Sequence, residues 1–223
     1  MAAFFTKEIT SFLRELTENN NRDWFNLNKD RFKKHAEQPF HSFIEKLIEK
    51  IKELDPRVTI TSKEAVFRIY KDIRFSKDKT PYKEFLSALI SPGGRKDHST
   101  PGLYMEMRKD GIQVYSGVYE PDPKQLLKIR LYIASHLKDF EKALSDKKFV
   151  KRYGKILGEK NKVLPVALKE AGQKQDLIFN KQFYYTTTLA KSWVTSDKLI
   201  NEIIQCYKDA LVISSFFEKA LKK

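Results

Sequence analysis

The chain has 223 residues, of which 41% are hydrophobic and 13% are aromatic, so it can bury a sizeable core and is not intrinsically disordered. Its 8 glycines and 8 prolines exclude a collagen-like or low-complexity chain. Lysine and arginine total 43 against 29 aspartates and glutamates, and the net charge of +14 directs attention to anionic partners.

The first 55 residues are predicted to be helical. Apolar side chains recur at helical spacing from Phe5 to Leu16, and the asparagines that follow end this helix. Asn21 is the expected N-cap of a second helix. A third helical run starts at Pro39, or is part of a longer helix kinked there, and Pro56 stops it.

Residues 57–120 are predicted to form the sheet. Short β-branched or aromatic segments between turn residues favour about five strands. They lie at Val58–Thr61, Ala65–Tyr70, Phe85–Ile90, Leu103–Arg108 and Ile112–Tyr119. The connections are too short for helical crossovers, and the Asp110-Gly111 step suits a tight hairpin. The sheet should therefore be mostly antiparallel.

Helices are predicted again over residues 122–223. Asp122 and Pro123 fit an N-cap followed by proline at the first helical position, and Thr195 or Ser196 is expected to cap a long last helix. Phe183–Leu189 fits either a strand or an irregular segment. Strands in the middle and helices at both ends predict one α+β domain over residues 1–223. Helices from the N- and C-terminal parts should pack against its central sheet.

The sequence also predicts where the protein acts. It has no basic region followed by an apolar run at its start, and no stretch approaches the roughly 20 apolar residues that span a bilayer. A single cysteine, Cys206, permits no intrachain disulfide, and the four histidines lack zinc-site spacing. We therefore expect a cytoplasmic protein that has no membrane contact, cofactor or metal.

The positive charge is unevenly distributed. Residues 120–175 carry 14 basic and 7 acidic side chains, which accounts for half of the net charge of +14. Most of this surplus falls in a basic run between Lys147 and Lys162. Such a run is more often a solvated helix face than a surface that follows nucleic-acid phosphates.

The segment Arg68–Lys83, which reads RIYKDIRFSKDKTPYK, is the most unusual part of the chain. If it is extended through residue 75, alternation places one set of side chains on one face: Phe67, Ile69, Ile73 and Phe75. The opposite face then holds Arg68, Tyr70, Asp72 and Arg74. The turn-forming residues 78–81 should fold the following lysines back over the same region. Guanidiniums gathered this way either pair with the nearby carboxylates or bind an anion.

This segment resembles the signature of an uncharacterised family, domain-of-unknown-function family 2461, which runs roughly R-I-Y-R-D-x-R-F-S-K-D-K-x-P-Y-K. Asn19-Asn20 and Trp24-Phe25 are similar to the family's opening, and Ile129-Arg130 to its middle. The likeness extends from about residue 4 to about residue 190. Lys71 stands where the family usually has arginine, which keeps the charge but loses the planar fork. The resemblance implies a family and a site, without an activity.

Three functional hypotheses follow. In the first, the protein binds a phosphorylated ligand or a nucleic acid through six basic side chains: Arg68, Lys71, Arg74, Lys77, Lys79 and Lys83. In the second, the same site belongs to an enzyme that acts on a phosphorylated substrate, with Asp72 or Asp78 as general base and Tyr82 as hydrogen-bond donor. In the third, the segment is a salt-bridge network within an interaction protein. We favour the first hypothesis and leave open whether the chain is an enzyme.

Overall fold

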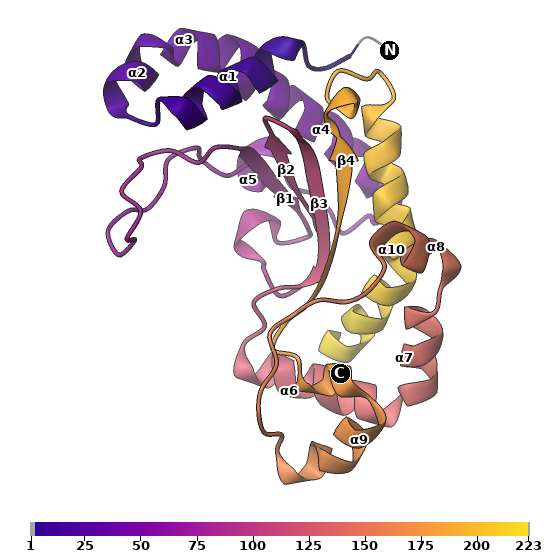
Figure 1. Ribbon diagram of the computed structural model, residues 1–223. Coiled ribbons are helices and arrows are strands. Elements are labelled where there is room, and N and C mark those ends of the chain that lie inside the picture. The colour runs from indigo at the N-terminus through magenta and orange to yellow at the C-terminus, as the bar shows by residue number, and fades with distance from the viewer. Residues whose placement is uncertain (1–2, 223) are drawn as a thin grey trace. The chain divides into compact units, whose positions relative to one another are not determined.

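The structure, a computed structural model, describes residues 3–222. Its described part combines helices with one antiparallel sheet of four strands, which follow one another in the order β1-β2-β3-β4 (Figure 1). These strands are β1 (Leu86–Ile90), β2 (Leu103–Arg108), β3 (Gly111–Val118) and β4 (Phe183–Ala190). The predicted α+β class and the antiparallel arrangement are therefore confirmed.

The predicted number of about five strands is wrong. Val58–Thr61 contains no strand, because Thr61 caps the short helix α5 (Ser62–Ala65) in a capping box with Glu64. The segment Ala65–Tyr70 meets its neighbour only through isolated bridges. In contrast, β4 lies in the part of the chain that was predicted to be mainly helical. For Phe183–Leu189 the strand alternative is therefore correct.

The N-terminal helices largely follow the sequence pattern. They are α1 (Lys7–Glu18), α2 (Arg22–Leu27), α3 (Lys29–Phe32), a π-helical turn η1 (Lys33–Glu37) and α4 (Gln38–Lys52). Asn21 caps α2, since its side chain accepts a hydrogen bond from the N–H of Trp24 at 2.9 Å. The π turn ends at Glu37, two residues before Pro39, which lacks the N–H for a helical hydrogen bond. Helical structure is continuous from Lys29 to Lys52, so Pro39 lies within a longer helical run and does not start one.

The chain divides into two compact units, which we describe separately. Unit 1 holds the described residues up to Arg95 together with Tyr104–Val114 and Thr188–Ile204. Unit 2 holds Lys96–Leu103, Tyr115–Thr187 and the described residues from Gln205 onward. The single-domain organisation stays a prediction.

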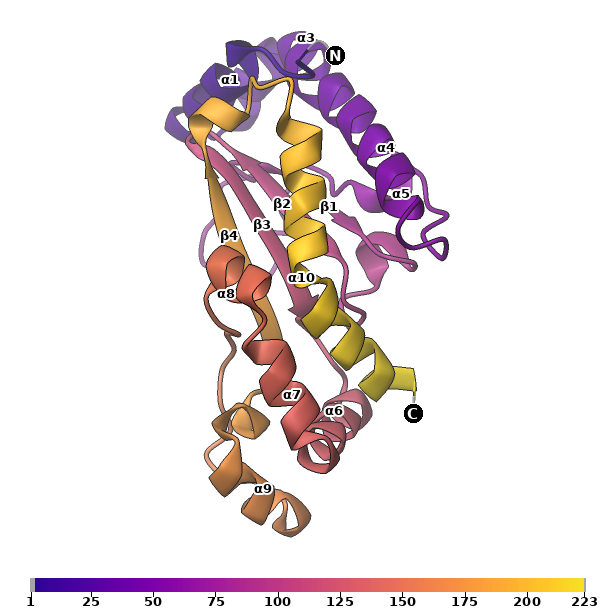
Figure 2. The ribbon, with the colours of Figure 1, turned by 90° about the vertical axis from the view of Figure 1, so that its right-hand side faces the viewer.

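Unit 1 has an aromatic core beneath its N-terminal helices. Phe12 of α1 lies 5.4 Å from Phe32, and Phe5 lies 5.2 Å from Phe43 of α4, measured between ring centroids. Helix α4 lies next to β1 (Figure 2). It buries an apolar stripe of side chains along its length. Burial of such a stripe, more than intrinsic propensity, stabilises a helix of this length. Two short 3-10 turns complete the connections: η2 (Gly94–Lys96) and η5 (Lys191–Trp193).

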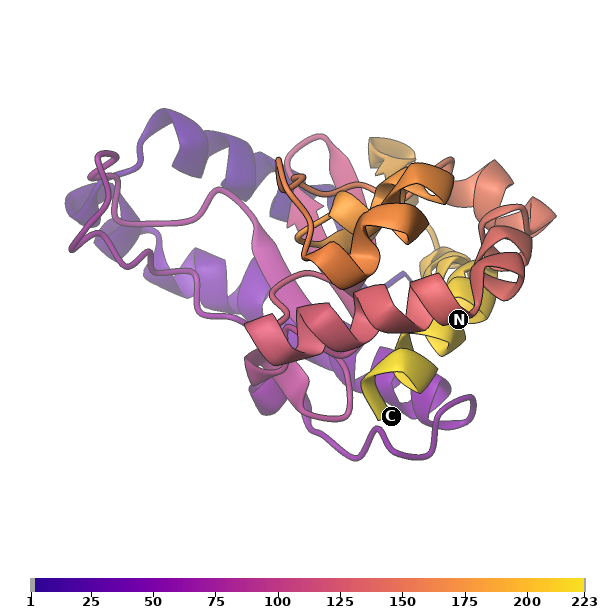
Figure 3. The same ribbon diagram turned by 90° about the horizontal axis from the view of Figure 1, so that it is seen from below.

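Unit 2 contains most of the C-terminal helices. They are α6 (Pro123–Ser135), α7 (Leu137–Leu144), α8 (Lys147–Tyr153) and α9 (Lys169–Lys174), with the 3-10 turns η3 (Val166–Leu168) and η4 (Asp176–Phe179). Helix α6 runs beside these turns (Figure 3). The expected N-cap is confirmed, since Asp122 forms a capping box with Gln125. The core of the unit includes Phe140, whose ring lies 5.0 Å from that of Phe216.

The last helix, α10 (Leu199–Lys222), begins later than predicted. Ser196 does not cap it: its carbonyl accepts from the N–H of Leu199 and its hydroxyl from the N–H of Lys198, which makes a turn ahead of the helix. The local hydrogen bonds of serine compete with a capping role at this position. None of the described helices combines the length and apolarity needed to cross a bilayer.

Candidate functional site

The charged segment forms a long loop with two extended arms in unit 1 (Figure 1). The arms pair through the N–H of Lys71, which donates to the carbonyl of Pro81 at 2.9 Å, and the N–H of Lys83, which donates to the carbonyl of Ile69 at 2.7 Å. Ile69 is buried, whereas Phe75 is 94% exposed. The predicted alternation required an extended chain through residue 75, but the backbone bends at Arg74 and Phe75, so Phe75 does not share the buried face of Ile69.

Tyr82 anchors the base of this loop. Its side chain is 3% exposed, and its ring stacks on that of Phe25 in α2 with centroids 4.0 Å apart. Asn20 holds the Tyr82 backbone: its Nδ2 donates to the carbonyl at 3.0 Å and its Oδ1 accepts from the N–H at 3.1 Å. Burial raises the pKa of Tyr82, so its hydroxyl stays protonated. Tyr82 thus has a structural role that the sequence reading did not include.

Two of the predicted ligand-binding cations are paired within the loop. The Nζ of Lys71 donates to Asp78 at 2.8 Å and to Thr80 at 2.6 Å. Arg74 forms two hydrogen bonds with Asp72, at 2.9 and 2.7 Å. Arg74 lowers the pKa of Asp72 to about 2, and Lys71 holds the pKa of Asp78 well below its usual range. Both carboxylates are therefore ionised and weakly basic, which is unfavourable for a general base near neutral pH.

Two other predicted lysines lie in the outer part of the loop. The Nζ of Lys79 folds back and donates to the carbonyl of Ile73 at 3.0 Å. Lys77 is exposed and has no hydrogen-bond or ion-pair partner among the described residues. Of these two lysines, only Lys77 therefore has an ammonium group without a hydrogen bond or ion pair among the described residues.

Arg68 and Lys83 lie close together at the inner end of the loop. Arg68 is exposed and makes no hydrogen bond or ion pair within residues 3–222. Lys83 is half-buried, and its Nζ lies 5.0 Å from the ring centroid of Phe67, in a cation–π contact. Burial and the positive charge of Arg68 lower the pKa of Lys83, while Glu106 acts weakly in the opposite direction. Neither cation forms an ion pair within the described residues, although each is attracted by a carboxylate beyond ion-pair distance, Arg68 by Asp72 and Lys83 by Glu106.

The nearest carboxylate is already occupied. Glu106 on β2 is 7% exposed, and it accepts two hydrogen bonds from Arg108, at 2.8 and 2.5 Å, and one from the Tyr104 hydroxyl, at 2.9 Å. Arg108 also lies over the ring of Phe85, 4.6 Å from its centroid. The sequence reading missed this row of side chains. Its available signal is a polar or charged residue at every second position of a strand, which places these side chains on one face.

The basic run between Lys147 and Lys162 lies in unit 2, whereas the loop belongs to unit 1. Part of the run is neutralised: Arg152 pairs with Asp209 at 3.0 Å, and Lys160 pairs with Asp176. The other basic side chains of the run are exposed. This arrangement agrees with a largely solvated helix face.

Other groups that often carry chemistry are not gathered into a second centre. Within residues 3–222, no three histidine, cysteine, aspartate or glutamate side chains converge in a way that could hold a metal ion. The thiol of Cys206 is buried in α10, and the backbone carbonyl of Cys206 accepts a hydrogen bond from the Tyr153 hydroxyl at 2.8 Å. These residues belong to the packing of unit 2.

Comparisons with known proteins identify the family. A family model described as a conserved hypothetical protein (DUF2461) matches residues 8–216, which include the whole charged loop. Comparisons with curated proteins and with solved structures give no match. Because the family model covers most of the chain, the protein belongs to the DUF2461 family of conserved hypothetical proteins.

Proposed function

We propose that the protein binds a phosphate-bearing anion at the Arg68–Lys83 loop, with Arg68 and Lys83 as its main contacts. One observation carries this proposal: Arg68 and Lys83 lie on paired arms and repel each other, and neither has an ion-pair partner among the described residues. Adjacent like charges are unfavourable unless a counter-charge approaches them. A bound anion would supply that counter-charge.

The chemistry of the two side chains favours phosphate. A guanidinium fork donates two parallel hydrogen bonds to an oxyanion, and a lysine adds a compact charge. Lys83 is already half-buried, so its attraction for an anion is less screened than that of an exposed lysine. Glu106 is committed to Arg108 and Tyr104, and therefore competes little for Lys83.

The remaining cations of the loop have a supporting role in this proposal. Lys71, Arg74 and Lys79 satisfy groups of the loop itself and fix its course. In this respect the salt-bridge hypothesis describes part of the segment. The enzyme hypothesis gains no support, since its two proposed bases, Asp72 and Asp78, are held ionised. We retain the expectation that this binding takes place in the cytoplasm.

A thermal-shift titration tests the proposal. Inorganic phosphate, glucose 6-phosphate and a short single-stranded oligonucleotide distinguish free phosphate, a phosphorylated metabolite and nucleic acid. A specific ligand at about 100 times its Kd adds about 2.7 kcal/mol to the free energy of unfolding, or roughly 5–10 °C in Tm for a chain of this size. Oligonucleotide binding should also weaken steeply with salt, because phosphate contacts release counterions.

Matched variants make the test specific. We expect Arg68→Ala and Lys83→Met to abolish the shift, whereas Lys52→Ala, which removes one exposed charge from the end of α4, should keep it. Equal losses in all three variants would reduce the effect to net charge and overturn the proposal. Absence of any shift with all three ligands would also overturn it.

A further inference from the structure

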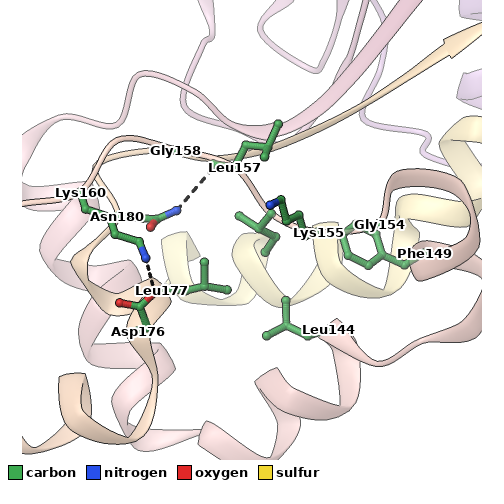
Figure 4. A pocket seen from close by; sticks show the side chains of 11 residues that line it. Leu144, Phe149, Gly154, Lys155, Leu157, Gly158, Lys160, Asp176, Leu177 and Asn180 are labelled. Carbon is green, nitrogen blue, oxygen red and sulfur yellow. Dashed lines mark hydrogen bonds and ion pairs between the residues drawn. The ribbon is translucent and has the colours of Figure 1, made fainter.

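Unit 2 contains a pocket that the charged loop does not share. Its volume is about 530 Å³, within the range of small-molecule sites (Figure 4). Its apolar side chains are Leu144, Phe149, Ile156, Leu157 and Leu177. Three charged side chains and one amide also line it: Lys155, Lys160, Asp176 and Asn180. The pocket is partly open to solvent, with polar and apolar atoms in similar proportion, and a concave surface that combines apolar side chains with a few polar groups can hold a small molecule.

Asn180 supplies an unused hydrogen-bond acceptor in this pocket. The residue is 1% exposed, and its Nδ2 donates to the carbonyls of Gln182, at 3.1 Å, and Leu157, at 3.4 Å (Figure 4). Its Oδ1 has no partner in the described structure. The two carbonyls fix the orientation of the amide, because a flipped side chain would place its oxygen against theirs. The free group is therefore an acceptor that needs an N–H or O–H donor.

A second buried group next to Asn180 is also incompletely satisfied. Arg130 is 5% exposed, and its Nη2 donates to the carbonyls of Asn180, at 2.9 Å, and Phe179, at 3.3 Å. Its Nε has no partner within the described residues. A buried donor or acceptor without a partner is unfavourable, so a ligand that supplied hydrogen bonds to Asn180 Oδ1 or Arg130 Nε would be stabilised here.

The charged residues of the pocket differ in whether they can interact with a ligand. Lys160 and Asp176 neutralise each other. Lys155 is exposed, and its side chain has no hydrogen-bond or ion-pair partner among residues 3–222. The pocket therefore offers an apolar interior, one buried acceptor and one free cation.

We propose that this pocket binds a small acidic molecule whose ring carries an N–H donor. The ring packs against the apolar side chains, its N–H donates to Asn180 Oδ1, and its acidic group lies near Lys155. Ring lactams and nucleobase-like groups have this chemistry, because their N–H is attached to a flat, largely apolar body. The site is independent of the proposed function at the loop in unit 1.

Heteronuclear NMR of the full chain with matched probes tests the proposal. Orotate and uridine 5′-monophosphate each combine a ring N–H with a negative charge. N3-methyluridine 5′-monophosphate lacks the N–H of uridine 5′-monophosphate, and uridine lacks its charge. We expect both complete probes to shift the Asn180 side-chain amide and the pocket signals. Loss of the buried hydrogen bond should weaken binding about tenfold for the methylated probe.

Variants locate the site. Lys155→Glu should weaken the binding of both complete probes, whereas Lys151→Glu, an equal charge change on the exposed part of α8 outside the pocket lining, should not. Leu144→Trp fills the pocket from its half-exposed wall and should abolish binding while the spectrum stays that of a folded protein. Arg68→Ala should leave the pocket signals unaffected.

Three outcomes would overturn the inference: no shift of pocket signals with either complete probe, equal affinity for the methylated probe, or equal effects of Lys151→Glu and Lys155→Glu. Shifts confined to residues around Arg68 and Lys83 would likewise reject this pocket while supporting the proposed function. Loss of all response at the loop, with pocket binding intact, would reject the proposed function alone.

Discussion

The side-chain amide of Asn20 forms two hydrogen bonds with the backbone of Tyr82, one to its carbonyl oxygen and one from its N–H. The two residues are 62 positions apart in the chain. Through this pair, the turn between α1 and α2 holds the second arm of the charged loop at Tyr82, near its end. The position of Arg68 and Lys83 therefore depends on contacts made by the N-terminal helices.

Removal of this amide should loosen the loop. Asn20→Ala leaves two part-buried backbone groups without their partner, and we expect a loss of about 1–3 kcal/mol in the free energy of unfolding. Asn20→Asp should be equally harmful, because a carboxylate cannot donate to the Tyr82 carbonyl. Urea denaturation measures both effects. The exposed Asn26 provides the control, and a similar loss for Asn26→Ala would contradict the role assigned to Asn20.

Anion binding at the loop should weaken at alkaline pH, because Lys83 loses its positive charge there. Its pKa in the folded protein is lowered from 10.5, chiefly by burial, so its charge is lost at a lower pH than that of an ordinary lysine. The Kd for phosphate should therefore rise with pH in a window that lies below 10.5. Titration calorimetry across this range measures the effect, which Lys77→Met should retain and which Lys83→Arg should lack, because a guanidinium stays charged throughout this window.

The same shift predicts the sign of a stability change. Between the folded pKa of Lys83 and the ordinary value of 10.5, the unfolded chain binds more protons than the folded one. The contribution of Lys83 to the free energy of unfolding consequently increases as the pH rises through this window. Relative to Lys83→Met, the wild-type protein should gain stability with rising pH. A parallel pH dependence in the two proteins would show that burial does not perturb Lys83.

Predictions from sequence succeeded where the determining interactions are local. The N-caps Asn21 and Asp122 act on residues within three positions, and the Asp110-Gly111 turn joins adjacent strands. The segment Ala65–Tyr70 has the composition of a strand, but it carries one arm of the loop and reaches its neighbour only at isolated bridges. Tertiary context overrides β-propensity in such a segment.

The charged loop and the pocket could be predicted only in part, because they depend on contacts that tertiary structure brings about. The charged segment is visible in the sequence, yet the division between paired and unpaired cations depends on how the loop turns. Lys71 forms an ion pair with Asp78, while Arg68 forms none among the described residues and only helps to lower the pKa of Asp72. The contact between Arg130 and Asn180 joins residues 50 positions apart, and no local pattern indicates it.

Release of a paired cation should strengthen anion binding. Asp78→Asn removes the charge that holds Lys71, and it leaves an additional ammonium group in the loop. We expect a lower Kd for phosphate, measured by titration calorimetry at low ionic strength, where the screening of exposed charges is weakest. The double variant Lys71→Met/Asp78→Asn is the control and should not show the gain. Weaker binding in Asp78→Asn would instead mean that the salt bridge is needed to shape the site.

Gly117 should be more sensitive to substitution than Gly154, although both have a positive φ, of 104° and 75°. A Cβ at Gly117 would lie 2.1 Å from the carbonyl oxygen of Phe183 on β4, whereas a Cβ at Gly154 meets nothing within 4 Å. Gly154→Ala therefore carries only the backbone strain of a positive φ at the centre of a tight three-residue turn, about 1–3 kcal/mol. Gly117→Ala should lose a further 1–3 kcal/mol, roughly, because β3 and β4 must separate to admit the methyl group. Urea denaturation of the two variants compares these losses directly, and equal losses would show that β4 lies farther from Gly117 than this structure places it.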